Sequence, residues 1–319
     1  MHTKVSVIIP VYNGEQFVSR AIQSALNQII KPFEVIVIND GSKDGTADKL
    51  AEFGNNINVI TIPNGGVANA RNIGITASTG EAIAFLDADD VWYEDKLKAQ
   101  LDVFVRYPEV GFCCCDFTFI ANGSDSVRKH FSRIKNTDDI IFDKPLKASA
   151  LEILITENFV GTCSNVMVRR KVLDQVGLFN INYKQSEDYD LWLRLALVTQ
   201  FVLMSAVLLE KKTHDTNLTN NFLETSLCHE KVLINLKAND FTADHINRLE
   251  MQYWSALAKV RYEIGNLFYE ANQKIQAFQY FFLGLRSNWT LKNFQMFSYY
   301  FSRKLIRTVS FGLIKSRQA

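Results

Sequence analysis

Cysteine and proline are both scarce, with five of each among 319 residues. Three of the cysteines, Cys113, Cys114 and Cys115, are consecutive. Consecutive residues of a strand face opposite sides of a sheet, so this run suits reduced, packed side chains better than a disulfide framework. No spacing of Cys and His is typical of a zinc site. The sequence therefore indicates neither a disulfide-stapled domain nor a zinc module.

Long apolar runs and a dominant charge sign are also missing. Spanning a bilayer takes roughly 20 apolar residues, and the nearest candidate, residues 191–209, is interrupted by Arg194 and Gln200. The net charge is only +1, which gives no global basic field, so we expect no nucleic-acid partner. Residues 1–4 lead directly into an apolar strand without the apolar region of a secretory signal, and we therefore expect a cytoplasmic protein.

What is present is an ordinary globular composition, 47% hydrophobic and 22% charged, at a length that suits one large or two modest domains. Val5–Val11 and residues 34–39 are β-rich runs separated by a helical pattern, and Asn58–Ile62 is a third such run. A helix is expected over Val67–Ala77. Strands that alternate with helices in this way form βαβ units, so the predicted fold class is α/β with a parallel sheet.

The most informative stretch is residues 80–90, an apolar run that ends in carboxylates. Its length and its Ile, Phe and Leu content predict a buried strand, which delivers Asp87, Asp89 and Asp90 at its end. Like charges so close raise each other's pKa unless a cation neutralises them. Hard oxygen ligands of this kind suit Mg²⁺ or Mn²⁺. The alternative is a solvated acidic turn that caps the next helix, expected over residues 93–107.

Four separate stretches should meet at one edge of the predicted sheet. Ligands of open parallel sheets bind at the carboxyl ends of the strands. Tyr12, Asp40, Gly65 and Asp87 all fall at such ends. We therefore predict a single crevice that these residues share.

The middle of the chain is less regular. Residues 110–121 are expected to form a pair of strands, and residues 162–168 a further strand. Between them, residues 122–146 are polar and basic with poor periodicity. A loop of this length inside a compact domain is more often functional than idle.

The last third of the chain has a helical pattern. Ser186 is expected to be the N-cap of the helix that precedes this region. From residue 221 on, Gly and Pro are rare, and residues 253–267 and 274–285 predict an antiparallel helix pair with Gly265 and Ala277 at the contact.

Five motifs follow one another along residues 3–217. They are Val7-Ile8-Ile9-Pro10-Val11-Tyr12-Asn13; Ile38-Asn39-Asp40-Gly41-Ser42 with Asp44-Gly45-Thr46; Gly66-Val67-Ala68 with Ala70-Arg71-Asn72; Phe85-Leu86-Asp87-Ala88-Asp89-Asp90; and Glu187-Asp188-Tyr189-Asp190-Leu191-Trp192. Together they resemble the family 2 glycosyltransferases of GT-A fold.

The resemblance implies a Rossmann-like, mostly parallel central sheet flanked by helices. It places a catalytic domain at residues 1–217 and an α-helical C-terminal region at residues 218–319. It further implies an inverting transferase that moves a hexose or N-acetylhexosamine from a nucleoside-diphosphate sugar, with UDP as the expected nucleotide. The acceptor would be a hydroxyl of a cell-surface glycan such as O-antigen, capsule or exopolysaccharide.

The resemblance also assigns donor-binding roles. Asp40 would accept hydrogen bonds from the uracil ring, while Pro10 and Tyr12 would present backbone and ring to the base. Arg71 would reach the nucleotide or steady the acidic cluster, and Asp87 would hold the ribose or a metal-bound water. Taken alone, these residues are also explained as an Asp-Gly turn, a strand-end turn and a surface ion pair.

The metal ion would be Mn²⁺ or Mg²⁺. In the resemblance Asp89 is the direct ligand, and the ion neutralises charge on the departing diphosphate as a Lewis acid. His214 falls where the family often has a histidine near the diphosphate or metal. A lone His in a polar loop also has the alternative of taking no part.

Asp188 is the predicted general base. Inversion in a single displacement needs a carboxylate on the acceptor side to take the hydroxyl proton. Glu187, Asp188 and Asp190 lie in the first turn of a helix, where the macrodipole alone also favours acids. The resemblance selects Asp188, with Glu187 in reserve.

The C-terminal tail is basic and apolar. Residues 271–319 contain no Asp or Glu and carry a net charge of +8, so the rest of the chain carries −7. Apolar residues recur at helical spacing: Phe294, Phe297, Phe301, Leu305, Val309 and Leu313. Such a helix lies on an anionic membrane surface or packs on the catalytic domain. A glycan or lipid-linked glycan acceptor favours peripheral contact with the inner face of the cytoplasmic membrane.

The sequence leaves two alternative functions. A sugar-1-phosphate nucleotidyltransferase would need a Gly-rich, Lys- or Arg-bearing loop after the first strand, where Tyr12, Asn13, Gly14 and Glu15 stand instead. A degenerate transferase kept as a glycan-binding or scaffold subunit is the second alternative. Intact Asp87, Asp89 and Asp188 argue against it.

Overall fold

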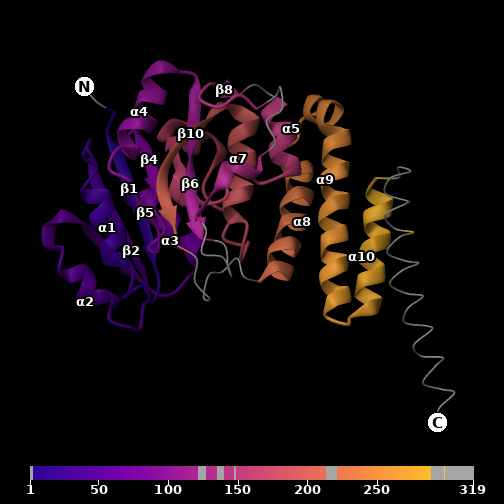
Figure 1. Ribbon diagram of the computed structural model, residues 1–319, viewed down its shortest axis with the longest axis horizontal. Coiled ribbons are helices and arrows are strands. Elements are labelled where there is room, and N and C mark those ends of the chain that lie inside the picture. The colour runs from indigo at the N-terminus through magenta and orange to yellow at the C-terminus, as the bar shows by residue number, and fades with distance from the viewer. Residues whose placement is uncertain are drawn as a thin grey trace, which may run out of the picture. The chain divides into compact units, whose positions relative to one another are not determined.

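The computed structural model describes residues 3–120, 127–134, 140–146, 149–212, 221–288 and 298. The chain divides into two compact units, Met1–Asn220 and Asn221–Ala319 (Figure 1). His214, residues 122–126 and 135–139 of the 122–146 loop, and the apolar residues named for the tail lie outside the described residues, so the predictions made for them stay predictions.

The first unit is built on one sheet of ten strands in order β3-β2-β1-β4-β9-β6-β10-β5, with β7 beside β6 and β8 beside β10. The strands are β1 Val5–Val11, β2 Glu34–Asp40, β3 Asn58–Ile62, β4 Ala82–Phe85, β5 Val91–Trp92, β6 Val110–Ile120, β7 Val127–Lys129, β8 Pro145–Leu146, β9 Val166–Arg169 and β10 Gln200–Lys211. The strands β1, β2, β3, β4, β6 and β10 run in one direction, and the others run against them. The expectation of a mostly parallel α/β sheet is confirmed.

Helices cover both faces of this sheet. They are α1 Val18–Leu26, α2 Thr46–Ala51, α3 Val67–Ala77, α4 Lys96–Arg106, α5 Ser149–Thr156, α6 Arg170–Val176 and α7 Glu187–Val198, with 3₁₀ turns η1 Gly54–Asn56, η2 His130–Arg133 and η3 Cys163–Asn165. Because strand side chains alternate, Val7 and Ile9 pack with α1 and α4. Ile36 and Ile38, on the other face, pack with Ala70 of α3.

Three local predictions were wrong. The pair of strands expected over residues 110–121 is wrong, since Val110–Ile120 form the single strand β6, with which β10 pairs along nearly its whole length. The helix expected from residue 93 begins at Lys96, since β5 occupies Val91–Trp92 and the Tyr93 N–H bonds to Leu208 O. The strand expected from residue 162 begins at Val166, because Thr162 accepts a hydrogen bond from the Ser164 N–H and starts the η3 turn.

The second unit contains α8 Phe222–Asn239, α9 Ala243–Glu270 and α10 Lys274–Ser287. Tyr262 packs with Phe281, and Ala258 lies beside Gly284, so α9 and α10 run antiparallel as predicted. A Cβ on Gly265 would lie 2.6 Å from the Phe281 ring and 3.3 Å from Ala277 O. The glycine thus permits the close helix contact expected from the sequence.

The first unit contains a buried lysine near the acidic stretch. Lys96 of α4 is fully buried. It donates to Gln100 Oε1 at 2.7 Å and lies 4.0 Å from the centroid of the Trp92 ring. Burial lowers the pKa of Lys96 from 10.5 to about 8. The folded protein therefore bears the cost of a buried charge at neutral pH.

Lys96→Met should be more stable than wild type at neutral pH, because it removes the buried charge. This advantage of the variant should shrink in alkali, where the wild-type lysine is neutral in the folded state. Between pH 8 and 10.5 Lys96 is protonated in the unfolded state and neutral in the folded state. The free energy of unfolding of the wild type therefore rises with pH in this range. The difference between Lys96→Met and wild type should fall by about 2 kcal/mol from pH 7 to pH 10. Urea denaturation at both pH values measures it. Lys98→Met, at an exposed site, serves as the control, and a difference independent of pH would contradict the account.

Candidate active site

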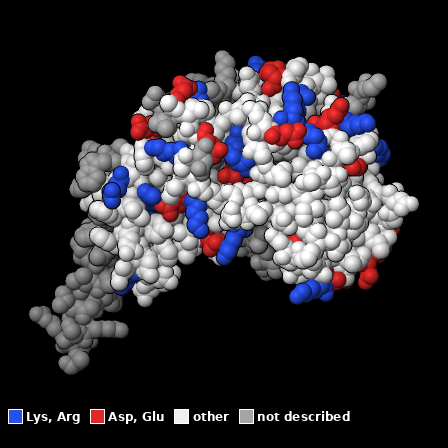
Figure 2. All heavy atoms as spheres, turned by 180° about the vertical axis from the view of Figure 1, so that it is seen from behind, with Lys and Arg blue, Asp and Glu red and all other residues white. Residues whose placement is uncertain are grey.

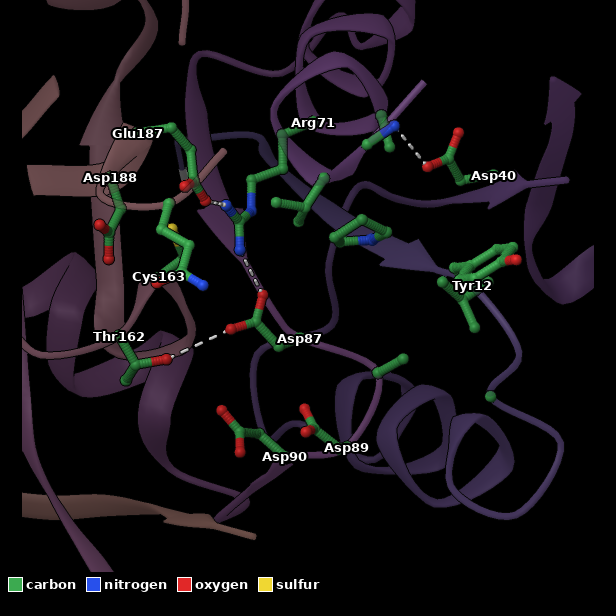
Figure 3. Close-up of a pocket in the computed structure, with 18 of the residues that line it drawn as sticks. Tyr12, Asp40, Arg71, Asp87, Asp89, Asp90, Thr162, Cys163, Glu187 and Asp188 are labelled. Carbon is green, nitrogen blue, oxygen red and sulfur yellow. Dashed lines mark hydrogen bonds and ion pairs between the residues drawn. The ribbon is translucent and has the colours of Figure 1, made fainter. Parts of the chain in front are cut away.

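The carboxyl ends of β1, β2 and β4 open into a cavity of about 750 Å³ (Figure 3). Of the residues predicted from the sequence, seven line it together: Pro10, Tyr12, Asp40, Arg71, Asp87, Asp89 and Asp188. The strand β1 pairs in parallel with both β2 and β4, which brings the carboxyl ends of the three strands to the same edge. Of the four residues predicted to share one crevice, Tyr12, Asp40 and Asp87 line this cavity, whereas Gly65 does not and instead donates its N–H to Asp40.

Asp40 is already engaged by the backbone. Its Oδ1 accepts from the Gly65 N–H at 2.7 Å and its Oδ2 from the Gly66 N–H at 2.9 Å. Gly66 has φ +85°, a conformation that side chains disfavour, and it precedes α3. Asp40 thus fixes the loop that starts α3. Any contact with a bound base would use the remaining lone pairs of its two oxygens.

Tyr12 and Pro10 differ in accessibility. Tyr12 is 50% exposed beside the cavity, whereas Pro10 at the end of β1 is buried. The next residue, Asn13, has φ +50° and is tied to the loop after β2 by hydrogen bonds to Ser42 and Lys43. The exposed tyrosine ring therefore stands on a braced turn and offers a flat surface to a ligand.

Arg71 joins three parts of the site. Its guanidinium, from α3, donates to Asp87 Oδ1 at 2.7 Å and to Glu187 Oε1 at 2.6 Å, and it lies over the Phe179 ring. Burial by itself would raise the pKa of Asp87, but Arg71 outweighs it and holds that pKa below its usual value. At Glu187 burial prevails over Arg71, and the pKa is raised. The loop after β4 and the start of α7 are thus fastened to one buried cation.

The acidic stretch contains one carboxylate that is only half satisfied. Asp90 is buried, and its Oδ1 accepts from the Lys212 N–H at 3.2 Å. Its Oδ2 is buried without a hydrogen-bond partner in the described part of the chain. Burial, together with the neighbouring charges of Asp89 and Asp87, raises the pKa of Asp90 to about 8. Asp89 is partly exposed and lines the cavity.

These carboxylates suit a divalent cation in part. A buried oxygen without a partner beside two further carboxylates is a donor set that Mg²⁺ or Mn²⁺ prefers. The described residues contain no group of three or more His, Cys, Asp and Glu side chains arranged around one point. Mg²⁺ often binds through one or two carboxylates and completes its shell with water and substrate phosphates. The loop fits that mode rather than an all-protein cage.

The first turn of α7 separates its three acids. Glu187 is buried and paired with Arg71, and Asp190 is buried and paired with Arg194 at 2.7 Å. Asp188 is partly exposed, lines the cavity and accepts from the Tyr189 N–H at 2.7 Å. In Figure 3 Glu187 points toward Arg71, while Asp188 lies beside it above Thr162. Within the described part of the chain, Asp188 is thus the acid of this turn that is not held in an ion pair.

The expected N-cap was wrong in its chemistry. Ser186 does occupy the position before α7, but its φ is +65° and its side chain makes no capping hydrogen bond. The hydroxyl is instead buried without a partner among the described residues. The left-handed backbone turns the chain so that residues 184–188 line the cavity.

Sequence reasoning missed the residues at the η3 turn, before the neighbouring strand β9, that hold the acidic stretch. Ser164 Oγ accepts from the Asp87 N–H at 2.9 Å, and Thr162 Oγ1 donates to Asp87 Oδ2 at 3.3 Å. The indole of Trp92 donates to Ser164 O at 2.8 Å. Thr162 and Ser164 were expected in a strand over residues 162–168, and no local signal in the sequence marks them as contacts of Asp87. Lys184 and Lys211, which also line the cavity, were likewise not singled out.

The sheet order and the acidic loop at its carboxyl edge define a protein of the GT-A glycosyltransferase fold. The Staphylococcus aureus TarS fragment 1–349 in complex with UDP-GlcNAc superposes with a TM-score of 0.63 at 18% identity, over 87% of this chain and 80% of that one, which shows the shared fold. The model of glycosyl transferase family 2 matches residues 6–177, more than half of the sequence. The chain belongs to glycosyl transferase family 2.

Two relatives show how far the similarity extends. An uncharacterized glycosyltransferase of Rickettsia conorii is 32% identical over 217 residues, which are 67% of this chain and 34% of that protein. The chain thus matches about a third of that relative's length. The Escherichia coli UDP-Glc:alpha-D-GlcNAc-diphosphoundecaprenol beta-1,3-glucosyltransferase WfgD is 32% identical over 193 residues, 60% of this chain and 69% of that protein.

Within the described ranges, no helix is both long enough and apolar enough to cross a membrane. Figure 2 shows acidic and basic side chains interspersed on the face of the first unit that it presents. That face carries no broad area of one sign.

Proposed function

We propose that this protein is a metal-dependent inverting glycosyltransferase that moves a hexosyl or N-acetylhexosaminyl group from a UDP-sugar to an acceptor hydroxyl in cell-surface glycan synthesis. The observation that carries the proposal is the charge arrangement in the cavity. Asp188 lies there and forms no ion pair with any of the described residues, while Asp87 and Glu187 are held by Arg71. A carboxylate held apart from the acidic loop in this way suits a base acting on the acceptor.

The donor would lie along the carboxyl edge of β1, β2 and β4. Tyr12 offers its exposed ring, and Asp40 and Pro10 line the neighbouring wall. Asp87, kept ionised by Arg71, suits the ribose hydroxyls as a hydrogen-bond acceptor. The name of the Escherichia coli relative includes a UDP-glucose donor, and TarS was crystallised with UDP-GlcNAc. Both support a UDP-sugar.

In the proposed reaction the acceptor hydroxyl attacks the anomeric carbon as Asp188 takes its proton. The new bond forms from the acceptor oxygen, and the bond from the anomeric carbon to the diphosphate breaks with inversion. Asp89, with Asp90 beside it and His214 as a further candidate, would hold the Mn²⁺ or Mg²⁺. When bound, the ion supplies Lewis-acid stabilisation of charge on the departing diphosphate.

The acceptor side of the proposal rests on the relatives and the tail. The acceptor in the name of WfgD is a lipid diphosphate that carries GlcNAc. A lipid-linked acceptor would suit a catalytic domain at residues 1–217 followed by a helical region at residues 218–319 that touches the cytoplasmic face of an anionic membrane. The net charge of +8 in residues 271–319 supports this placement.

Calorimetric titration with UDP should show binding that depends on Mn²⁺ and on Asp89. We expect Asp89→Ala, or the omission of Mn²⁺, to weaken UDP binding at least about tenfold. In both cases the contact between the metal ion and the diphosphate is lost. Asp102→Ala, which removes an exposed carboxylate of α4, is the matched control and should bind as wild type does.

Equal affinity with and without Mn²⁺ would contradict metal dependence. If wild type bound none of UDP, GDP and dTDP, the donor site itself would be refuted. The scaffold alternative would then be the better account of the intact acids.

A further inference from the structure

Besides Arg71, the described residues contribute two cationic side chains to the cavity wall, Lys184 and Lys211. Arg71 is buried between Asp87 and Glu187, so its charge is committed to those carboxylates. Neither lysine forms an ion pair with a carboxylate in the described part of the chain. Lys184 belongs to the segment before α7, whereas Lys211 is the last residue of β10.

The sheet places Lys211 beside the acidic stretch. The short strand β5 follows Asp90 directly and pairs antiparallel with β10, with Val91 opposite Glu210. Lys211 is the next residue of β10. Lys211 lines the same cavity as Asp87, Asp89 and Asp90.

The adjacent lysine is disposed differently. The ammonium of Lys212 lies 5.2 Å from the centroid of the Phe17 ring, and its backbone N–H donates to Asp90. Lys212 itself does not line the cavity, while Lys211 does. The end of β10 therefore presents one of two consecutive lysines to the ligand space.

The charge balance of the cavity calls for such a cation. A nucleoside diphosphate would bring further negative charge next to Asp87, Asp89 and Asp90. One divalent ion offsets only part of that charge, and Arg71 is already neutralised. A lysine ammonium is a compact charge that can follow a phosphate group as it moves away.

We propose that Lys211 is a further catalytic residue, whose ammonium contacts the β-phosphate of the donor and stabilises the diphosphate as it leaves. This inference rests on the proposed function. As the bond from the anomeric carbon to the β-phosphate oxygen breaks, its electron pair passes to that oxygen, and the acceptor proton passes to Asp188. Lys211 keeps all its protons and acts by charge and hydrogen bonding.

The test is the difference between UDP and UMP binding, measured by calorimetry with Mn²⁺ present throughout. UMP lacks the β-phosphate. Lys211→Met should weaken UDP binding about tenfold and leave UMP binding within about twofold, since one charge-assisted hydrogen bond is lost. Lys211→Arg should restore most of the preference for UDP. Thermal melting of each variant checks that the fold is kept.

Lys184→Met is the matched control, because it removes the other cavity lysine from a different segment. It should leave the ratio of UDP to UMP affinity unchanged. An equal fall in this variant would mean a diffuse field rather than a contact and would overturn the inference. So would a Lys211→Met protein that keeps the wild-type ratio. Wild type that binds neither nucleotide would refute the proposed function and the inference with it.

Discussion

Asp188→Asn should lower kcat by about 10³-fold, which is within the usual contribution of a general base. The substitution is nearly isosteric, and the amide oxygen can still accept the hydrogen bond from the Tyr189 N–H. It removes the capacity to take a proton from the acceptor. UDP affinity should stay near that of wild type, because Asp188 lies in the first turn of α7 and not in the acidic stretch after β4. Release of UDP from UDP-sugars, with GlcNAc-diphosphoundecaprenol as the probe acceptor, measures the effect.

Glu187→Gln is the matched comparison, one residue earlier in the same turn. Glu187 is buried against Arg71, so its amide variant should disturb positioning and lose no more than about tenfold in kcat. The opposite order, with Glu187→Gln inactive and Asp188→Asn active, would make Glu187 the base. That outcome would require the ion pair with Arg71 to open when the acceptor binds.

Arg71→Met should cost about 3–5 kcal/mol of the free energy of unfolding, the usual penalty for removing one partner of a buried ion pair. Asp87 and Glu187 would lose the cation that holds them. Both carboxylates would then have pKa values above those of the unfolded chain. The folded variant would bind more protons than the unfolded chain, so its stability should fall as pH rises from 5 to 8.

Guanidinium denaturation at pH 5 and pH 8 measures this loss, and the deficit against wild type should be larger at pH 8. Lys98→Met breaks an exposed ion pair and should change stability by less than about 1 kcal/mol. Arg71→Met combined with Glu187→Met should recover part of the deficit, since one unpaired acid is removed. A deficit below about 1 kcal/mol, or one equal at both pH values, would show that Arg71 does not hold the two acids together.

Local patterning was sufficient for the frame of the first unit. Val5–Val11, the strand that ends at Asp40, and the run before Asp87 are apolar segments between helical ones. Parallel connection of such strands brings their carboxyl ends to one edge without further information. For this reason Tyr12, Asp40, Gly65 and Asp87 were predicted to share a crevice, and all of them except Gly65 line one cavity.

Patterning failed where the partner of a residue lies far along the chain. The η3 turn starts with the local hydrogen bond from the Ser164 N–H to Thr162, and Ser164 Oγ also accepts from the N–H of Asp87, 77 residues away. The helix that begins at Lys96 was predicted to begin at residue 93, because the pairing of β5 with β10 has no local signature in the sequence. Ser186 has the residue type of an N-cap but makes no capping hydrogen bond. Its left-handed backbone instead turns the chain so that residues 184–188 line the cavity.

The sequence by itself determined the α/β class, the acidic stretch at a strand end and the group of acids that opens α7, because each depends on residue type and short spacing. The resemblance favoured Asp188 in that group, but residue type and spacing did not separate the three acids, and their ion pairing was decided by tertiary structure. Arg71 reaches Glu187 across 116 residues, Arg194 takes Asp190, and Asp188 remains at the cavity. The choice between Lys211 and Lys212 was likewise made by the pairing at the end of β10. Charge pairing depends on distance in space, and the spacing of residues along the chain does not encode that distance.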